Sequence, residues 1–285
     1  MTSRPLRPCP AMSSSTTLAE TLYVPHREQV ATTNAWAFLH WLRTVRGIDL
    51  TGWAELQRLS AINPTDFADA LVNFAGLSEE PMPLARHAGA REALVLRRGD
   101  AGRVAFSRDA LLSPCPDLPD PIAAPLARRW PKALLVRPLA ELLLFADFRP
   151  DDRVLVAGGA TWPWFAALTL GTTIILAPPA PLLPATAQEA ATVLIAPGAA
   201  LAGIAFRRAG ARPNLGALRT IIATGGPLSP PERVRIYTWI KSDLMLLARS
   251  GDTVWGNPME PVSSRPKPTP ALGLRPSPPR GSAKR

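Results

Sequence analysis

The stretch Arg219-Thr220-Ile221-Ile222-Ala223-Thr224-Gly225-Gly226-Pro227-Leu228-Ser229-Pro230 decides the fold of this chain. Its first residues, 219–222, are mostly apolar and β-branched and predict a buried strand. Ser229 is a suitable N-cap for a helix over 231–240, and a second apolar strand is expected over 243–247. A strand, a helix and another strand in this order are typical of a βαβ unit with parallel strands. The fold class is therefore predicted to be α/β.

The same alternation continues from this unit toward the N-terminus. Further strands are expected over 153–156, 172–176 and 192–195, and further helices over 135–145, 164–170 and 199–209. Continuous apolar strands alternating with helices are typical of a parallel sheet covered on both faces. We therefore expect a mostly parallel sheet flanked by helices. Ligands of such sheets bind beyond the carboxyl ends of the strands.

A small helical region is expected before the sheet. Helices are predicted over 27–45, around 53–59 and from Asn63-Pro64 to Phe74, followed by a hairpin over 93–106. The predicted organisation is a flexible N-terminus (1–20), a helical region plus hairpin (21–112), a Pro-rich linker (113–131), an α/β core (132–257) and a basic, Pro-rich, disordered tail (258–285).

Composition and charge exclude several classes of protein. The 33 prolines among 285 residues argue against a helical bundle or coiled coil, because proline interrupts helices. The formal net charge is +10, but residues 258–285 hold six Lys and Arg against one Glu. Because so much of the charge lies in a tail, we expect weak, salt-sensitive contact with polyanions at most, and no nucleic-acid partner.

Membrane, disulfide and metal functions are not predicted. The most apolar window, about 166–184, is interrupted by Gly171 and several prolines, and the first residues lack the apolar segment of a secretory signal. The expected location is the cytoplasm. Cys9 and Cys115 form no metal-binding pair, and the three histidines lack ligand spacing, so we predict no metal site.

Small residues follow three of the predicted strands where a ligand would bind. The strand over 153–156 leads to Gly158 and Gly159, and the strand over 219–222 leads to Gly225 and Gly226. The strand over 243–247 leads to Ser250-Gly251-Asp252-Thr253. Glycines let the backbone approach a ligand closely, and hydroxyl and N–H groups can donate to a phosphate. A Gly-Gly turn before a helix is also a common purely structural feature. We find no Ser/His/Asp or Cys/His arrangement and assign no catalytic residue.

These segments resemble the adenylate-forming (AMP-binding) acyl-CoA synthetases, especially the acetoacetyl-CoA and acetyl-CoA synthetase branch. Residues 224–230 resemble the family's STG.PLSP step, and residues 250–262 resemble SGGTD followed by GNP..PV. Residues 137–176 resemble the segment that carries GDR and GWM.W, and residues 22–77 resemble the N-terminal helical region. The resemblance implies a reduced version of the N-terminal domain of these enzymes.

The resemblance also implies binding residues and ligands. Gly225, Gly226 and Pro227 would lie against adenine, and Ser250, Gly251, Asp252 and Thr253 near the adenylate phosphate. Trp162, Trp164 and Phe165 would line an acyl pocket. The implied partner is a small acyl, CoA or nucleotide ligand. ATP or AMP and Mg²⁺ are implied as cofactors only if the chain is a ligase.

The sequence departs from the family pattern at the segments that carry the family's catalytic groups. The Ser/Thr/Gly-rich phosphate loop ending in Pro-Lys should lie between the hairpin and residue 135, where this chain has its Pro-rich linker. Ser250-Gly251-Asp252-Thr253 lacks one glycine, and Val254 stands where the family has an acid. The ribose-binding Asp and the C-terminal domain with its adenylation Lys have no match either. Because such groups stabilise developing charge, we expect a degenerate synthetase, a pseudoenzyme with little or no ATP-dependent adenylation.

Three alternatives stay open at the sequence level. The degenerate synthetase would bind a ligand, a protein partner or a second copy of itself. A working acid–CoA ligase, weak or completed by another chain, would still adenylate an acyl substrate. An unrelated binding module would touch nucleic acid or a membrane through its basic tails. Pyrophosphate exchange separates the second alternative from the first, and deletion of residues 258–285 tests the third.

Overall fold

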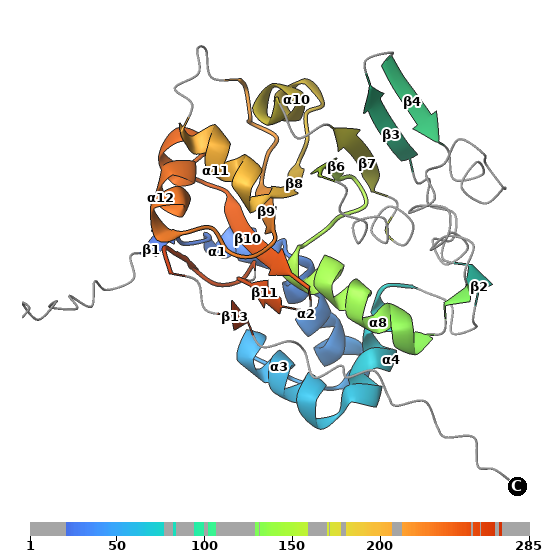
Figure 1. Ribbon diagram of the computed structural model, residues 1–285. Helices are drawn as coiled ribbons and strands as arrows, with labels where there is room; N and C mark the ends of the chain where they lie inside the picture. Colours follow the sequence, from blue (N-terminus) through green and yellow to red (C-terminus); the bar gives the residue numbers. More distant parts are fainter. Residues whose placement is uncertain are drawn as a thin grey trace, which may run out of the picture.

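The computed structural model describes residues 21–76, 82–83, 94–99, 102–106, 129–130, 132–158, 170, 172–177, 181–206, 213–251, 253–256, 258–265 and 268–269. Its centre is a nine-stranded sheet (Figure 1). The strand order is β13 (Pro268–Thr269), β11 (Thr253–Trp255), β10 (Met245–Ser250), β9 (Thr220–Thr224), β8 (Val193–Pro197), β6 (Arg153–Ala157), β7 (Thr173–Ala177), β3 (Leu94–Gly99) and β4 (Gly102–Phe106).

The six central strands, from β10 to β3, run parallel, which confirms the predicted fold class. Their apolar residues form the middle of one hydrophobic core, and Val154, Leu155, Val193, Leu194 and Ile221 have no measurable exposure. The predicted hairpin is confirmed as β3 and β4. Strand β3 also pairs with β7, so the hairpin continues the main sheet.

Helices cover the sheet and build the N-terminal region. Those between or beside the strands are α8 (Lys132–Ala140), the π-helix η1 (Glu141–Phe145), α10 (Leu182–Gln188), α11 (Gly198–Phe206) and α12 (Pro230–Trp239). The N-terminal helices are α1 (Arg27–Ala31), α2 (Asn34–Arg46), α3 (Trp53–Ile62) and α4 (Pro64–Phe74). Helices α2 and α4 pack on η1 and α8, which joins this region to the sheet (Figure 1).

The prediction of a single helix over 27–45 is wrong, because the structure has two helices there, separated at Thr32 and Thr33. The backbone of Thr33 is extended, and its Oγ1 accepts the N–H of Trp36 at 3.2 Å. A threonine in that conformation starts a new helix, since it satisfies one of the free N–H groups of the first turn. The helical periodicity of the sequence does not reveal this break.

The predicted disordered tail over 258–285 is wrong for its first residues. Strand β12 (Val262–Ser263) pairs with β1 (Thr21–Tyr23) at the other end of the chain, and Val262 is buried. Arg233 of α12 is 2% exposed and donates from Nε to the carbonyl of Ser263 at 2.9 Å. Burial lowers the pKa of Arg233, and Tyr237 beside it opposes this shift. These contacts hold residues 258–265 on the folded body.

Two more features complete the described parts of the chain. Strand β2 (Met82–Pro83) pairs with β5 (Arg129–Trp130) in a second small sheet. Among the residues that the structure describes, no helix combines the length and the apolar character needed to cross a membrane.

Candidate functional site

The candidate site lies at the carboxyl edge of the parallel strands, where β9 and β10 end side by side. Met245 to Arg249 of β10 are in parallel register with Thr220 to Thr224 of β9. The turns that follow the two strands therefore begin side by side at the same edge of the sheet. The turn after β9 begins with Gly225 and the turn after β10 with Gly251. A ligand at this edge would meet both turns.

The two turns are joined directly through the backbone. The N–H groups of Gly225 and Gly226 both donate to the carbonyl of Arg249, at 2.9 and 3.3 Å. Gly225 and Gly226 have φ values of +89° and +121°, and a Cβ on either would meet no atom within 4 Å. Their amides are thus engaged within the protein, while their Cα faces border open space. This geometry suits contact with a flat ring better than a phosphate cradle.

The opposite part of the same edge is tightly packed. Gly158 follows β6 with a φ of +80°, and a Cβ there would lie 2.6 Å from Cγ of Pro197 at the end of β8. A Cβ on Gly198 would lie 3.7 Å from the carbonyl oxygen of Thr224. The carboxyl edge is therefore continuous from β6 through β8 to β9.

An ion pair from a flanking helix reaches the same edge. Oε2 of Glu141, at the start of η1, accepts from Nε of Arg249 at 3.0 Å, and their ion-pair distance is 2.8 Å. Oε1 of Glu141 accepts from Nε of Arg137 at 3.3 Å. The Glu141 side chain is 11% exposed and that of Arg249 is 23% exposed. No feature of the local sequence predicted this pair, because its members lie more than a hundred positions apart.

The structure brings together part of the predicted site. The amides of Gly225 and Gly226 donate to the carbonyl of Arg249, which directly precedes Ser250 and Gly251, and Pro227 follows Gly226 in the same turn. Thr253 starts β11 and pairs with Ser250, so these residues close a hairpin that was not predicted. Asp252 and the predicted acyl-pocket residues lie outside the described residues, and their assignments stay predictions: Trp162, Trp164 and Phe165.

A cavity of about 180 Å³ lies at the other, amino-terminal edge of the sheet. It is lined by the β1–α2 segment and by the starts of β9 and β10, including Tyr23, Gln29, Thr220 and Met245. Because ligands of parallel sheets bind at the carboxyl ends, this cavity does not belong to the candidate site.

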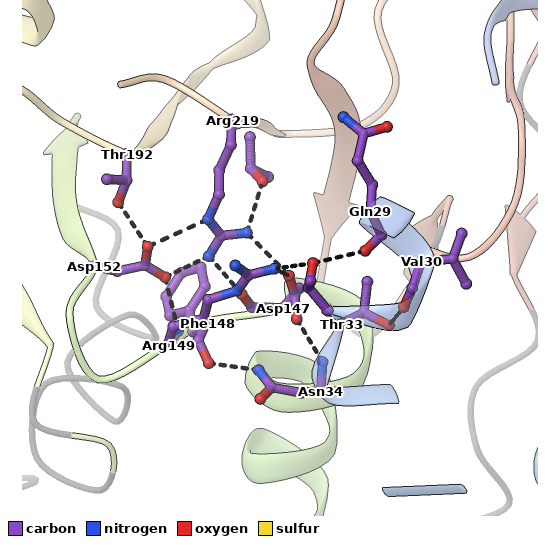
Figure 2. A network of polar contacts seen from close by, with 12 residues as sticks. Gln29, Val30, Thr33, Asn34, Asp147, Phe148, Arg149, Asp152, Thr192 and Arg219 are labelled. Atoms are coloured by element: carbon purple, nitrogen blue, oxygen red, sulfur yellow. Dashed lines mark hydrogen bonds and ion pairs between the residues drawn. The ribbon is translucent and has the colours of Figure 1, made fainter. Parts of the chain in front are cut away.

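A buried polar network borders that cavity (Figure 2). The guanidinium of Arg219 lies between two buried carboxylates, Asp147 at 3.1 Å and Asp152 at 2.5 Å. Asp147 also accepts from Arg149 at 2.8 Å and from the backbone N–H of Asn34 at 2.7 Å. The network thus links the first residue of α2 to the start of β9, which sequence reasoning did not foresee.

Asp147 carries a pH-dependent part of the stability. Burial raises the pKa of Asp147 above its ordinary value, although Arg219 and Arg149 act in the opposite direction. In the pH range between its unfolded and folded pKa values, the native state binds more protons than the unfolded state. Acidification through that range therefore stabilises the native state through this residue.

Replacing Asp147 with asparagine should remove this contribution. As the pH falls from 7 to 4, the free energy of unfolding of the wild type is expected to rise relative to that of Asp147→Asn. Urea unfolding at several pH values measures the difference. Asp151→Asn, which removes an exposed carboxylate from the adjacent turn, is the control and should follow the wild type. A constant difference between wild type and Asp147→Asn would contradict the prediction.

Comparison with known proteins supports the resemblance seen in the sequence. A segment of 163 residues, 49% of this chain, is 31% identical to acetoacetyl-coenzyme A synthetase of Rhizobium meliloti (strain 1021). The fold matches the solved structure of acetoacetyl-CoA synthetase from Streptomyces lividans with a TM-score of 0.66, covering 85% of this chain and 67% of that one at 15% identity. The fold of this chain is therefore similar to that of an acetoacetyl-CoA synthetase, and half of its sequence is similar to another protein of that name. The sequence match spans only 24% of the Rhizobium protein.

Two other comparisons give a lower similarity or none. A long-chain-fatty-acid-CoA ligase from Archaeoglobus fulgidus aligns with 43% of this chain and 28% of its own, at a TM-score of 0.38 and 11% identity. No family model matches the sequence.

The described residues of this synthetase-like chain do not fit a Mg²⁺ ion. Glu141 lies beside Arg249 at the carboxyl edge, but both of its oxygens accept from arginines. Mg²⁺ needs free oxygen ligands in octahedral geometry. No group of three or more His, Cys, Asp or Glu that could hold a metal occurs within the described part of the chain.

Proposed function

We propose that this chain binds an adenine nucleotide at the carboxyl edge of β9 and β10 and does not carry out ATP-dependent adenylation. One observation carries the proposal: both turn amides of Gly225 and Gly226 donate to Arg249, which leaves the open Cα faces of the glycines toward the site. The family resemblance of this turn supports adenine as the group that would lie there. The kinship with acetoacetyl-CoA synthetase supports an adenylate as the ligand.

Loss of adenylation is supported by the sequence between the hairpin and residue 135. Catalysis of phosphoryl or nucleotidyl transfer depends on groups that stabilise the developing charge, and each such group contributes about 10²–10³-fold in rate. The family's phosphate loop is replaced there by a Pro-rich stretch. The carboxylate of Glu141 is held by two arginines and is not available as a metal ligand.

Thermal unfolding with and without AMP tests the binding. At a concentration of 100 times Kd, AMP should stabilise the wild type by about 2.7 kcal/mol and raise Tm by about 5–10 °C. Gly226→Ala should lose this shift, because its φ of +121° is strained for alanine and the new Cβ enters the open space. Gly203→Ala, inside α11 with no atom within 4 Å of the new Cβ, should keep the shift. Absence of any shift in the wild type would defeat the proposal.

A working ligase is the second candidate, favoured by the 31% identity to a protein named acetoacetyl-coenzyme A synthetase. Exchange of labelled pyrophosphate into ATP, with acetoacetate and Mg²⁺ present, separates the two candidates. The proposed function expects no exchange above the protein-free background. Exchange that depends on acetoacetate would establish the ligase and overturn the loss of adenylation.

A further inference from the structure

We propose that Glu141 is a positioning residue for the Gly225-Gly226 turn and acts through Arg249. The contacts form an unbroken path from the carboxylate of Glu141 to the guanidinium of Arg249, and from the carbonyl of Arg249 to both turn amides. The value of this arrangement for a nucleotide rests on the proposed function. The positioning itself is a property of the protein without ligand.

Glu141 is held rigidly at the start of the path. The four residues that follow it in η1, Leu142 to Phe145, are all buried. The ring of Phe145 packs edge-on against Trp53 of α3, with 4.8 Å between ring centres. The backbone carbonyl of Glu141 accepts the N–H of Ala146 at 2.9 Å. The carboxylate is therefore presented from a packed helix, and a π-helical turn is a common device for aiming a functional side chain.

Arg249 connects Glu141 to the turn, because its side chain contacts Glu141 and its carbonyl accepts from the turn amides. It is the last residue of β10 in register with β9, opposite Thr224, and it also lies opposite Val254 of β11. Beyond this point the two parallel strands separate into their turns. A strand end frays more easily than a strand centre because it has fewer neighbours to hold it. An ion pair at this residue therefore restrains the position at which the Gly-Gly turn is attached.

Glu141 is the central residue of a three-residue ion-pair cluster. Its carboxylate lies between the cations of Arg137 and Arg249. Glu141→Gln keeps the shape of the side chain but leaves these two cations without the negative charge between them. Because a partly buried guanidinium that loses one of its charged partners is held less firmly, we expect the end of β10 to loosen.

Amide hydrogen exchange without ligand tests the inference. In Glu141→Gln, the amides of Gly225 and Gly226 should exchange about tenfold faster than in the wild type, when normalised to Leu194 and Ile195 in the central strand β8. Glu189→Gln is the matched control. It removes the same charge from an Arg–Glu pair, with Arg153 at 3.2 Å, at the amino-terminal edge of the sheet, and should leave the two turn amides at their wild-type rates.

Each outcome of the exchange experiment decides the inference. Unchanged rates for Gly225 and Gly226 in Glu141→Gln, or equal acceleration in both variants, would overturn it. If Glu141→Gln does not fold, Arg249→Lys replaces it, keeps the cation and should accelerate exchange by about threefold through loss of the paired N–H contacts. AMP binding by the wild type is measured separately. Fast turn exchange in Glu141→Gln without AMP binding by the wild type would defeat the proposed function and leave the positioning role intact.

Discussion

Replacing Arg219 with methionine is expected to lower the free energy of unfolding by about 3–5 kcal/mol, because it leaves two buried carboxylates without their shared cation. The side chains of Asp147 and Asp152 are 5% and 3% exposed, and both contact the Arg219 guanidinium. Methionine fills a similar volume but donates no hydrogen bond. For a chain of this size, the change corresponds to a fall in Tm of about 6–20 °C, measured by thermal and urea unfolding.

The matched control for this substitution is Arg58→Met on the exposed side of α3. A surface arginine contributes little to stability, so the control should change the free energy of unfolding by less than about 0.5 kcal/mol. An effect of Arg219→Met below about 1 kcal/mol would mean that water or another group compensates the carboxylates, and that the network in Figure 2 contributes little.

Gly158→Ala is expected to destabilise the fold by about 2–3 kcal/mol. The left-handed backbone at φ +80° is unfavourable for alanine, and the added Cβ would lie 2.6 Å from Cγ and 3.0 Å from Cδ of Pro197. The proline ring has no flexible end that could swing aside. The clash should be relieved by separation of β6 and β8 at the carboxyl edge. Urea unfolding measures the loss of stability.

Gly203→Ala supplies the contrast for the same chemical change. Gly203 lies within α11, and a Cβ there would meet no atom within 4 Å. Because alanine is a better helix former than glycine, this variant should be more stable than the wild type by about 0.5–1 kcal/mol. Equal effects of the two substitutions would show that close packing at Gly158 does not constrain the sheet edge.

The parallel core could be predicted from sequence because its signals are local. Apolar β-branched runs such as 219–222 predict buried strands, and Ser229 as an N-cap predicts the start of α12. The structure confirms that start, since the Glu232 carboxylate accepts from the N–H and the hydroxyl of Ser229 at 2.8 and 2.6 Å. Because parallel strands end at one edge, their sequence positions also predict that Gly225 and Gly251 lie at the same edge of the sheet.

The remainder could not be predicted because it depends on pairs distant in the chain. No local sequence pattern identifies the partners in three such pairs: Asp147 with Arg219, Glu141 with Arg249, and β1 with β12. The engagement of the Gly225 and Gly226 amides by Arg249 is likewise a product of strand register. A glycine pair in a sequence indicates a flexible turn and does not indicate whether its N–H groups are free.

The pairing of β1 with β12 also bears on how the chain reaches its native state. Thr21 lies opposite Ser263, so nearly all of the described chain separates the two strands. During synthesis the first strand leaves the ribosome long before its partner exists, and closing so long a loop is entropically costly. The stacking of Tyr23 on Tyr237, with ring centres 6.4 Å apart, therefore belongs among the last steps of folding. Until that step, Tyr237 of α12 lacks the covering ring of Tyr23, and Arg233 lacks the carbonyl of Ser263 as its acceptor.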